Sequence, residues 1–252
     1  MRRVLVTGAA AGLGAALAAA FRARGDEVLA TDRVADPPAI WPLDITADED
    51  WARALAEVER RWAGLDVLVN NAGIAGGGRL DVATIEEWQR LLEVNLLGMV
   101  RGLRSFTPLL KRQRSGWIVN VASLAGLVHP AGMAAYNATK AAVVALTETA
   151  GHELAGYGVR ACAVCPSYFR TGLVDSLDGS DAAVGAVVAE LVRRAPYSAD
   201  DIAAAVLAGL DRGEELILPD PAAASAWALK QTDRAAYDAQ LRHQAARLEE
   251  LT

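Results

Sequence analysis

The chain has 252 residues, 53% of them hydrophobic, and a formal net charge of −6. This length and apolar share suffice for a folded domain with a sizeable core, and they exclude a wholly disordered chain. The negative charge argues against nucleic-acid binding, and no apolar run approaches the roughly 18 residues that a membrane span requires.

Strand-like runs alternate with longer helical patterns along the chain. Strands are predicted at residues 3–7, 27–31, 40–43, 66–70, 117–122, 159–165 and 216–218. Helices are predicted at 13–24, 47–62, 84–112, 134–157, 182–194 and 199–212, and the tail 222–251 has helical spacing. Continuous apolar strands separated by helices indicate a single-domain α/β fold, a doubly wound parallel sheet of about seven strands. The first strand begins almost at Met1, so we expect no targeting segment and a cytoplasmic location.

The two cysteines, Cys162 and Cys165, form a C-x-x-C that invites a metal or redox interpretation. They lie in the predicted strand 159–165, where residues three apart point to opposite faces, so the thiols should diverge. Further metal ligands are not available nearby. We therefore expect two small core residues and no metal site. The cationic run 111–114 is expected at a helix C-terminus, where positive charge suits the helix dipole.

A glycine-rich turn follows the first strand and leads into a helix. Gly8, Gly12 and Gly14 have the spacing G-x3-G-x-G, which lets a pyrophosphate approach the backbone amides and the helix N-terminus. Asp32 ends the second strand about 20 residues after Gly12, where a carboxylate accepts hydrogen bonds from a ribose and repels a 2′-phosphate. Arg33 could grip that phosphate instead, but Asp32 favours NAD over NADP.

A tyrosine and a lysine four residues apart, Tyr136 and Lys140, should share one face of the helix 134–157. A tyrosine pKa near 10 must fall to about 7 for base catalysis, which takes roughly 4 kcal/mol of phenolate stabilisation. We expect the lysine and a positively charged nicotinamide ring to supply it. Ser123 follows the strand 117–122 at the sheet's C-terminal edge. It either holds a substrate oxygen while Tyr136 handles the proton, or it simply forms a turn.

An asparagine, Asn95, falls on the apolar stripe of the predicted helix 84–112, between Leu92 and Met99. A buried amide costs free energy unless it is hydrogen-bonded, so Asn95 should have a specific partner. A structural amide that bends the helix and a functional amide are both open interpretations, and the two roles can coexist.

These motifs together resemble the short-chain dehydrogenase/reductase family in its compact, Rossmann-type form. The resemblance is carried by TGAAAGLG at 7–14, the turn Asn70-Asn71-Ala72-Gly73, Asn95, Ser123 and Tyr136-x3-Lys140, in matching order from Val4 to Leu218. In that family the tyrosine is the general acid/base and the lysine lowers its pKa and binds the nicotinamide ribose. The serine positions the substrate oxygen, and the asparagine holds a water of the proton relay. The resemblance therefore implies the catalytic set Tyr136, Lys140, Ser123 and Asn95.

The resemblance also implies which residues hold the dinucleotide. Asp44 and Ile45 should border the adenine, 71–73 the adenosine ribose, and 166–171 the carboxamide, with Thr171 as the hydroxyl. Ser167 stands where glycine is usual, and Tyr168-Phe169 are bulkier than common. The expected cofactor residues are Gly8, Gly12, Leu13, Gly14, Asp32, Arg33, Asp44, Ile45, Asn71, Ala72, Gly73, Tyr136, Lys140, Pro166, Phe169 and Thr171.

A dry pocket beside the nicotinamide is expected to receive the substrate. Its predicted residues are Ser123, Leu124, His129, Met133 and Tyr168, with Ile74, Phe169 and a lid segment at about 172–198 as further walls. The mostly apolar walls favour a hydrophobic secondary alcohol or ketone. His129 is a second polar contact or simply solvated, and Arg170 meets a carboxylate or faces solvent.

Assembly and two competing functions complete the expectations. The resemblance implies a homodimer or homotetramer through 84–112 and 134–157. The tail 220–252 lies beyond the core 3–219, and we expect it to dock either on the body of its own chain or on a partner subunit. One alternative activity is epimerisation or dehydration through a transient hydride step, although relatives that do this normally carry a larger C-terminal domain. The other alternative is a catalytically silent cofactor sensor or scaffold, which can dispense with Tyr136 and Lys140.

Overall fold

The strands form one parallel sheet of seven, in the order β3-β2-β1-β4-β5-β6-β7. The computed structural model describes residues 1–36, 39–173, 177 and 179–250. The strands are β1 (Arg3–Thr7), β2 (Glu27–Asp32), β3 (Trp41–Pro42), β4 (Val67–Asn70), β5 (Gly116–Val121), β6 (Val159–Val164) and β7 (Leu216–Ile217). The order reverses between β1 and β4, as in doubly wound sheets, so the predicted fold class is confirmed.

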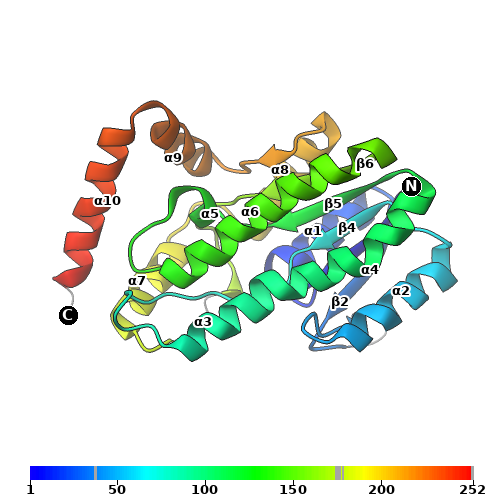
Figure 1. Ribbon diagram of the computed structural model, residues 1–252, viewed down its shortest axis with the longest axis horizontal. Helices are drawn as coiled ribbons and strands as arrows, with labels where there is room; N and C mark the ends of the chain where they lie inside the picture. Colours follow the sequence, from blue (N-terminus) through cyan, green and yellow to red (C-terminus); the bar gives the residue numbers. More distant parts are fainter. Residues whose placement is uncertain (37–38, 174–176, 178, 251–252) are drawn as a thin grey trace.

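Helices cover both faces of the sheet (Figure 1). Their bounds are α1 (Gly12–Ala23), α2 (Asp48–Trp62), α3 (Ile85–Leu92), α4 (Gly98–Gln113), α5 (Ala125–Val128), α6 (Ala134–Leu154), α7 (Ala182–Arg193), α8 (Ala199–Arg212), α9 (Pro221–Thr232) and α10 (Arg234–Glu249), with η1 (Glu93–Leu97) and η2 (Ala155–Tyr157). One apolar cluster joins the sheet to α1 and α8, and another joins its opposite face to α2, α4 and α6. Among the described residues, no helix has the length and apolar character needed to cross a membrane.

The central strands are mostly apolar because helices cover both faces of the sheet. All four residues of β4 are buried, and the buried residues of β6 face alternate clusters. Cys162 lies in the cluster under α1 and α8, whereas Cys165 lies in the cluster of α6 and α9, so the thiols diverge as predicted. Burial raises the pKa of both thiols to about 12.

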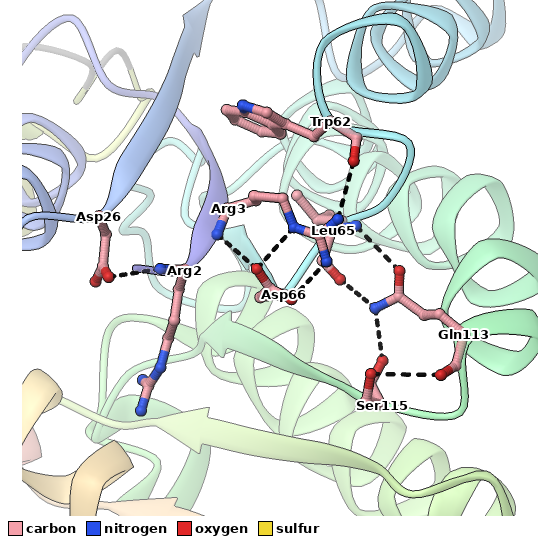
Figure 2. A network of polar contacts seen from close by, with 8 residues as sticks. All are labelled: Arg2, Arg3, Asp26, Trp62, Leu65, Asp66, Gln113 and Ser115. Atoms are coloured by element: carbon pink, nitrogen blue, oxygen red, sulfur yellow. Dashed lines mark hydrogen bonds and ion pairs between the residues drawn. The ribbon is translucent and has the colours of Figure 1, made fainter.

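A network of hydrogen bonds and ion pairs links the N-terminal ends of β1, β4 and β5 (Figure 2). The Arg3 guanidinium donates to both carboxylate oxygens of Asp66, at 2.8 and 2.7 Å, and to the carbonyl of Trp62 at 3.0 Å. The Arg3 backbone N–H also donates to Asp66 at 2.7 Å, and Gln113 bonds the backbone of Leu65. The Arg3 guanidinium holds the pKa of Asp66 below its ordinary value. This edge is opposite the C-terminal ends of the strands, so the network ties strands together at a distance from any site there.

Two predicted helical segments are interrupted in the structure. The predicted helix 84–112 is divided into α3 and α4 by the π-helical turn η1, which contains Asn95. The tail forms two helices that meet at Asp233, whose side chain caps α10 by accepting from Ala236 N at 2.9 Å. The short helix α5, which begins two residues after Ser123, is not predicted from the sequence because its four residues are too few to show a helical period.

Candidate active site

A cavity of about 1310 Å³ opens at the C-terminal ends of the strands, on both sides of the point where the strand order reverses. Its walls come from the turns after β1, β2, β4, β5 and β6, from α6 and α7, and from the tail helices α9 and α10. In open parallel sheets this position is where ligands bind. The sequence-predicted residues therefore converge on one place, with the exceptions given below.

Three of the four predicted catalytic residues meet at the inner wall of the cavity. Ser123 follows β5, and its hydroxyl lies near Tyr136, in the first turn of α6, where it favours the phenolate. Lys140 lies one turn further along α6, with its Nζ 5.7 Å from the centroid of the Tyr136 ring. The ammonium donates to the Val121 carbonyl at 3.0 Å, which anchors the lysine to the end of β5. Tyr136 and Lys140 are 8% and 4% exposed, so both polar groups act in a largely dry environment.

Burial dominates the ionisation of this pair. It raises the pKa of Tyr136 to about 12, which the hydrogen bond from Ser123 only partly opposes. It lowers the pKa of Lys140 to about 8. The predicted tyrosine pKa near 7 requires the lysine and a nicotinamide ring together; the protein groups by themselves raise the pKa of Tyr136. The reason is that removing a phenolate from water costs more free energy than its interactions with the neighbouring protein groups regain.

The fourth predicted catalytic residue, Asn95, acts on the backbone of another segment. Its side chain is 1% exposed, accepts from the N–H of Ile74 at 2.8 Å and donates to the Ile74 carbonyl at 3.0 Å. Gly73 makes room for it, because a Cβ there would lie 2.9 Å from the Asn95 Oδ1. Among the described residues that line the cavity, Ile74 is present and Asn95 is not. Asn95 therefore lies in the π-helical turn η1 and holds one wall of the cavity through Ile74.

The glycine-rich turn after β1 is packed against the segment after β4. Gly8 and Gly12 have φ of +67° and +55°, and a Cβ at Gly14 would lie 2.1 Å from the Gly8 carbonyl oxygen. Asn71 donates to the carbonyl of Thr7 at 2.9 Å. Gly8, Gly12 and Leu13 line the cavity, whereas Gly14, predicted as a cofactor contact, is absent from the described lining residues. Gly14 instead allows α1 to approach the turn closely, because it has no Cβ.

The carboxylate predicted to read the ribose is held in place by backbone donors. Asp32 accepts from Ala10 N at 3.0 Å and from Val34 N at 3.1 Å, which keeps it at the rim beside the glycine-rich turn. Arg33 also lines the cavity. Asp44 accepts from the backbone and the hydroxyl of Thr46 at 2.9 and 2.7 Å, and these bonds lower the pKa of its carboxyl. The remaining predicted cofactor residues at the rim are in place: Ile45, Asn71, Ala72, Gly73, Pro166, Phe169 and Thr171.

The segment 166–171 crosses the mouth of the cavity beside the glycine-rich turn. A Cβ at Gly12 would lie 2.8 Å from the Thr171 hydroxyl, which shows how close the two segments come. Ser167, the residue in place of the usual glycine, bonds Asp220. Arg170 donates to the carbonyls of Ala195 and Pro196 at 2.6 and 2.7 Å. Its guanidinium is therefore held just beyond α7, and Arg170 is exposed and absent from the described lining residues, which agrees with the solvent-facing role left open for it.

The inner part of the cavity has apolar walls. Tyr136 packs in one cluster with Met133, Tyr168, Val184 and Leu248, so α7 and α10 both cover the site. Leu124 and Met133 line the cavity as predicted. His129 does not: its ring contacts the Gly126 carbonyl at 3.1 Å and Lys230 Nζ at 3.2 Å. A left-handed φ of 49° at the end of α5 turns this residue toward α9.

Several site residues were missed by the sequence analysis. The Thr7 hydroxyl accepts hydrogen bonds from the N–H groups of Asn71 and Ala72, both at 3.0 Å. The only sequence signal for this role is that Thr7 is the first residue of the glycine-rich motif. The tail contributes a further set of lining residues: Ala226, Gln240, Leu241, Gln244, Arg247, Leu248 and Glu250. Tyr237 is buried against the body in one cluster with Trp227, Leu229 and Leu241. The tail therefore docks on the body of its own chain. Residues 174–176 and 178 of the predicted lid and residues 251–252 of the tail lie outside the described residues.

Comparisons with known proteins agree with this architecture. The model of the short chain dehydrogenase family matches residues 2–181. The 2-(R)-hydroxypropyl-CoM dehydrogenase of Xanthobacter autotrophicus is 37% identical over 188 residues, 68% of this chain and 75% of that protein. The 3-alpha-(or 20-beta)-hydroxysteroid dehydrogenase of Mycobacterium tuberculosis is 35% identical over 182 residues, 68% of this chain and 70% of that protein.

Solved structures show the same likeness. A short-chain dehydrogenase/reductase from Burkholderia phymatum in complex with NAD superposes with a TM-score of 0.85 at 27% identity, covering 92% of this chain and 94% of that one. A short-chain dehydrogenase from Burkholderia cenocepacia in complex with NADP gives 0.81 at 31% identity, covering 95% and 97%. The order of the strands, the cavity at their C-terminal ends and these matches lead to one conclusion: the chain is a member of the short-chain dehydrogenase/reductase family of oxidoreductases.

Proposed function

We propose that the chain is an NAD-dependent oxidoreductase that interconverts a hydrophobic secondary alcohol and the corresponding ketone. The observation that carries the proposal is the group formed by buried Tyr136 and Lys140 with half-buried Ser123 at the wall of the cavity. A phenol that lies near a serine hydroxyl and a lysine ammonium is equipped to exchange a proton with a substrate oxygen. Buried titratable groups with shifted pKa values are concentrated at functional sites.

The roles of the three side chains follow from their positions. The Ser123 hydroxyl holds the substrate oxygen, and Tyr136 Oη takes the hydroxyl proton in oxidation and returns it in reduction. Lys140 keeps a positive charge beside the phenol, which favours the phenolate that oxidation requires. Asn95 positions Ile74, next to this group. When bound, a nicotinamide ring supplies the hydride chemistry that no side chain provides.

The rim of the cavity fits a dinucleotide. Gly8, Gly12 and Leu13 present backbone at the N-terminus of α1, where a pyrophosphate is favoured. Asp44 and Ile45 would border the adenine, 71–73 the adenosine ribose, and Pro166, Phe169 and Thr171 the carboxamide. Asp32 supports NAD, because its carboxylate is already oriented by two backbone N–H groups and would repel a 2′-phosphate. Arg33 lies beside it on the rim and is the group that would favour NADP.

The walls support an apolar substrate. Leu124, Met133, Val184 and Val188 line the inner cavity, and Tyr168 adds an aromatic face. The relatives from Xanthobacter and Mycobacterium are named as dehydrogenases of a hydroxypropyl and a hydroxysteroid compound, which supports a substrate with a CH–OH group. The homodimer or homotetramer and the cytoplasmic location stay predictions.

The proposal is tested by turnover of the purified protein with NAD and, separately, with NADP, against a panel of hydrophobic secondary alcohols and ketones. We expect activity with NAD and a loss of at least about 100-fold in kcat for Tyr136→Phe, with dinucleotide binding retained. Tyr157→Phe is the matched control, because Tyr157 is exposed on η2 beyond α6. Activity with NADP alone would overturn the cofactor assignment, and full activity of Tyr136→Phe would overturn the catalytic one.

A further inference from the structure

The carboxylate of Asp220 joins two parts of the molecule that lie far apart in sequence. Its Oδ2 accepts the backbone N–H of Ser167 at 2.9 Å, and its Oδ1 accepts the Ser167 hydroxyl at 2.6 Å. Asp220 is 3% exposed, so these bonds form almost out of water. Hydrogen bonds to a charged acceptor in such surroundings are stronger than ordinary ones.

The same carboxylate starts the C-terminal tail. Asp220 is the N-cap of α9 and its Oδ1 also accepts from Ala223 N, at 2.9 Å. Pro221 occupies the first turn, where its fixed φ suits a helix start, and Ala223 is fully buried. The beginning of α9 and the conformation at Ser167 are therefore fixed by one group.

Ser167 is the second residue of the segment 166–171, and it lines the cavity. The segment is held before this point by Leu124 N, which donates to the Pro166 carbonyl at 2.9 Å. It is held after this point by Arg170 N, which donates to the Tyr197 carbonyl at 2.9 Å. Between these two bonds, Asp220 fixes both the backbone and the side chain of Ser167. Tyr168 and Phe169, the next two residues along the chain, both line the cavity.

We propose that Asp220, acting through Ser167, is a positioning residue for the nicotinamide half of the cofactor site, and that the C-terminal tail is thereby a part of that site. The inference rests on the proposed function, in which 166–171 holds the carboxamide. A serine in place of the usual glycine is useful here because its hydroxyl gives Asp220 a second bond. That second bond sets the orientation of the segment 166–171 at Ser167. A single bond to the backbone N–H would leave the segment free to rotate about it.

The test compares two ligands that share the adenosine half and differ in the nicotinamide. NADH and ADP-ribose are titrated by calorimetry into the full-length wild type and the variants Asp220→Asn and Ser167→Ala. Asp220→Asn replaces one acceptor oxygen by an NH2 donor that faces the donors of Ser167. We expect its Kd for NADH to rise roughly 10- to 100-fold, and that of Ser167→Ala roughly 10-fold, while the Kd for ADP-ribose changes less than about twofold.

Asp233→Asn is the matched control, because Asp233 also caps a tail helix, accepting from Ala236 N at 2.9 Å, without touching 166–171. It should leave both Kd values unchanged. If Asp220→Asn fails to fold, Ser167→Ala carries the test, since it keeps the cap of α9. Equal weakening of both ligands, no weakening of NADH, or equal wild-type affinity for NADH and ADP-ribose would each overturn the inference. If the wild type binds and turns over NAD while the variants bind NADH normally, this inference alone is overturned. If the wild type binds neither ligand, both the inference and the proposed function are overturned.

Discussion

Asn95 and Ile74 exchange two hydrogen bonds, from backbone N–H to amide oxygen at 2.8 Å and from amide NH2 to backbone carbonyl at 3.0 Å. A π-helical turn carries Asn95, and Ile74 lines the cavity, so the pair connects a distortion of a helix to a wall of the site. π-Helical turns cost stability and are frequently found at functional sites.

Replacing Asn95 by alanine should therefore weaken both the fold and the site. It would leave the N–H and the carbonyl of Ile74 without their partner, and we expect a loss of about 2–3 kcal/mol in the free energy of unfolding. Urea denaturation measures this loss, and kcat should fall in the same variant because the wall beside Tyr136 moves. Unchanged stability would show that Ile74 finds other partners easily.

Gly14→Ala should disrupt the glycine-rich turn, although Gly14 does not touch the cavity. The new Cβ would lie 2.1 Å from the Gly8 carbonyl oxygen, so α1 or the turn must shift. We expect a loss of about 1–3 kcal/mol in stability and at least tenfold weaker dinucleotide binding. Gly156→Ala is the matched control, because no atom lies within 4 Å of the Cβ it would add. Equal behaviour of the two variants would contradict the packing argument.

Lys140→Met should remove activity and change the pH dependence of stability. The folded-state pKa of Lys140 is about 8 against an ordinary 10.5, so between these values the unfolded chain binds more protons than the folded one. Wild-type stability should accordingly rise with pH from 8 to 10.5, by roughly 3 kcal/mol relative to the methionine variant. Chemical denaturation at pH 7 and pH 10 measures the difference. Lys111→Met, at the C-terminal end of α4, should keep the wild-type profile; a parallel pH dependence in Lys140→Met would refute the prediction.

Asp66→Asn should affect stability without affecting the cofactor. Arg3 lowers the pKa of Asp66, so the contribution of this ion pair is present above the ordinary carboxyl pKa and is lost as pH falls through the lowered one. At neutral pH we expect the variant to lose about 1–2 kcal/mol, since the pair is partly exposed. Its Kd for the dinucleotide should equal that of wild type, because the network lies at the opposite edge of the sheet. A changed Kd would mean that strand register couples the two edges.

Much of the fold could be predicted because alternating strands and helices leave few ways to cover a parallel sheet. The positions of Ser123, Tyr136 and Lys140 followed from their places at strand and helix ends. The π-helical turn at Asn95 could not be predicted, because its apolar pattern is that of an ordinary helix. The place of His129 outside the cavity could not be predicted, because it depends on the left-handed backbone of His129 at the end of α5 and on its contact with Lys230 in α9. The tail helices gave no sign in their sequence of which body surface they cover, since α10 lacks a distinct apolar face and only Tyr237 is fully buried.

The burial of Cys162 in β6 and of Cys165 just after it, in two different apolar clusters, has a practical consequence. A thiol whose pKa is about 12 is almost entirely protonated at neutral pH and reacts very slowly with alkylating reagents. A cysteine introduced at Leu191, which is 44% exposed and lines the mouth of the cavity on α7, would therefore take a fluorescent label selectively in the otherwise unaltered chain. Ligand entry under α7 can then be followed in real time without first removing the native thiols.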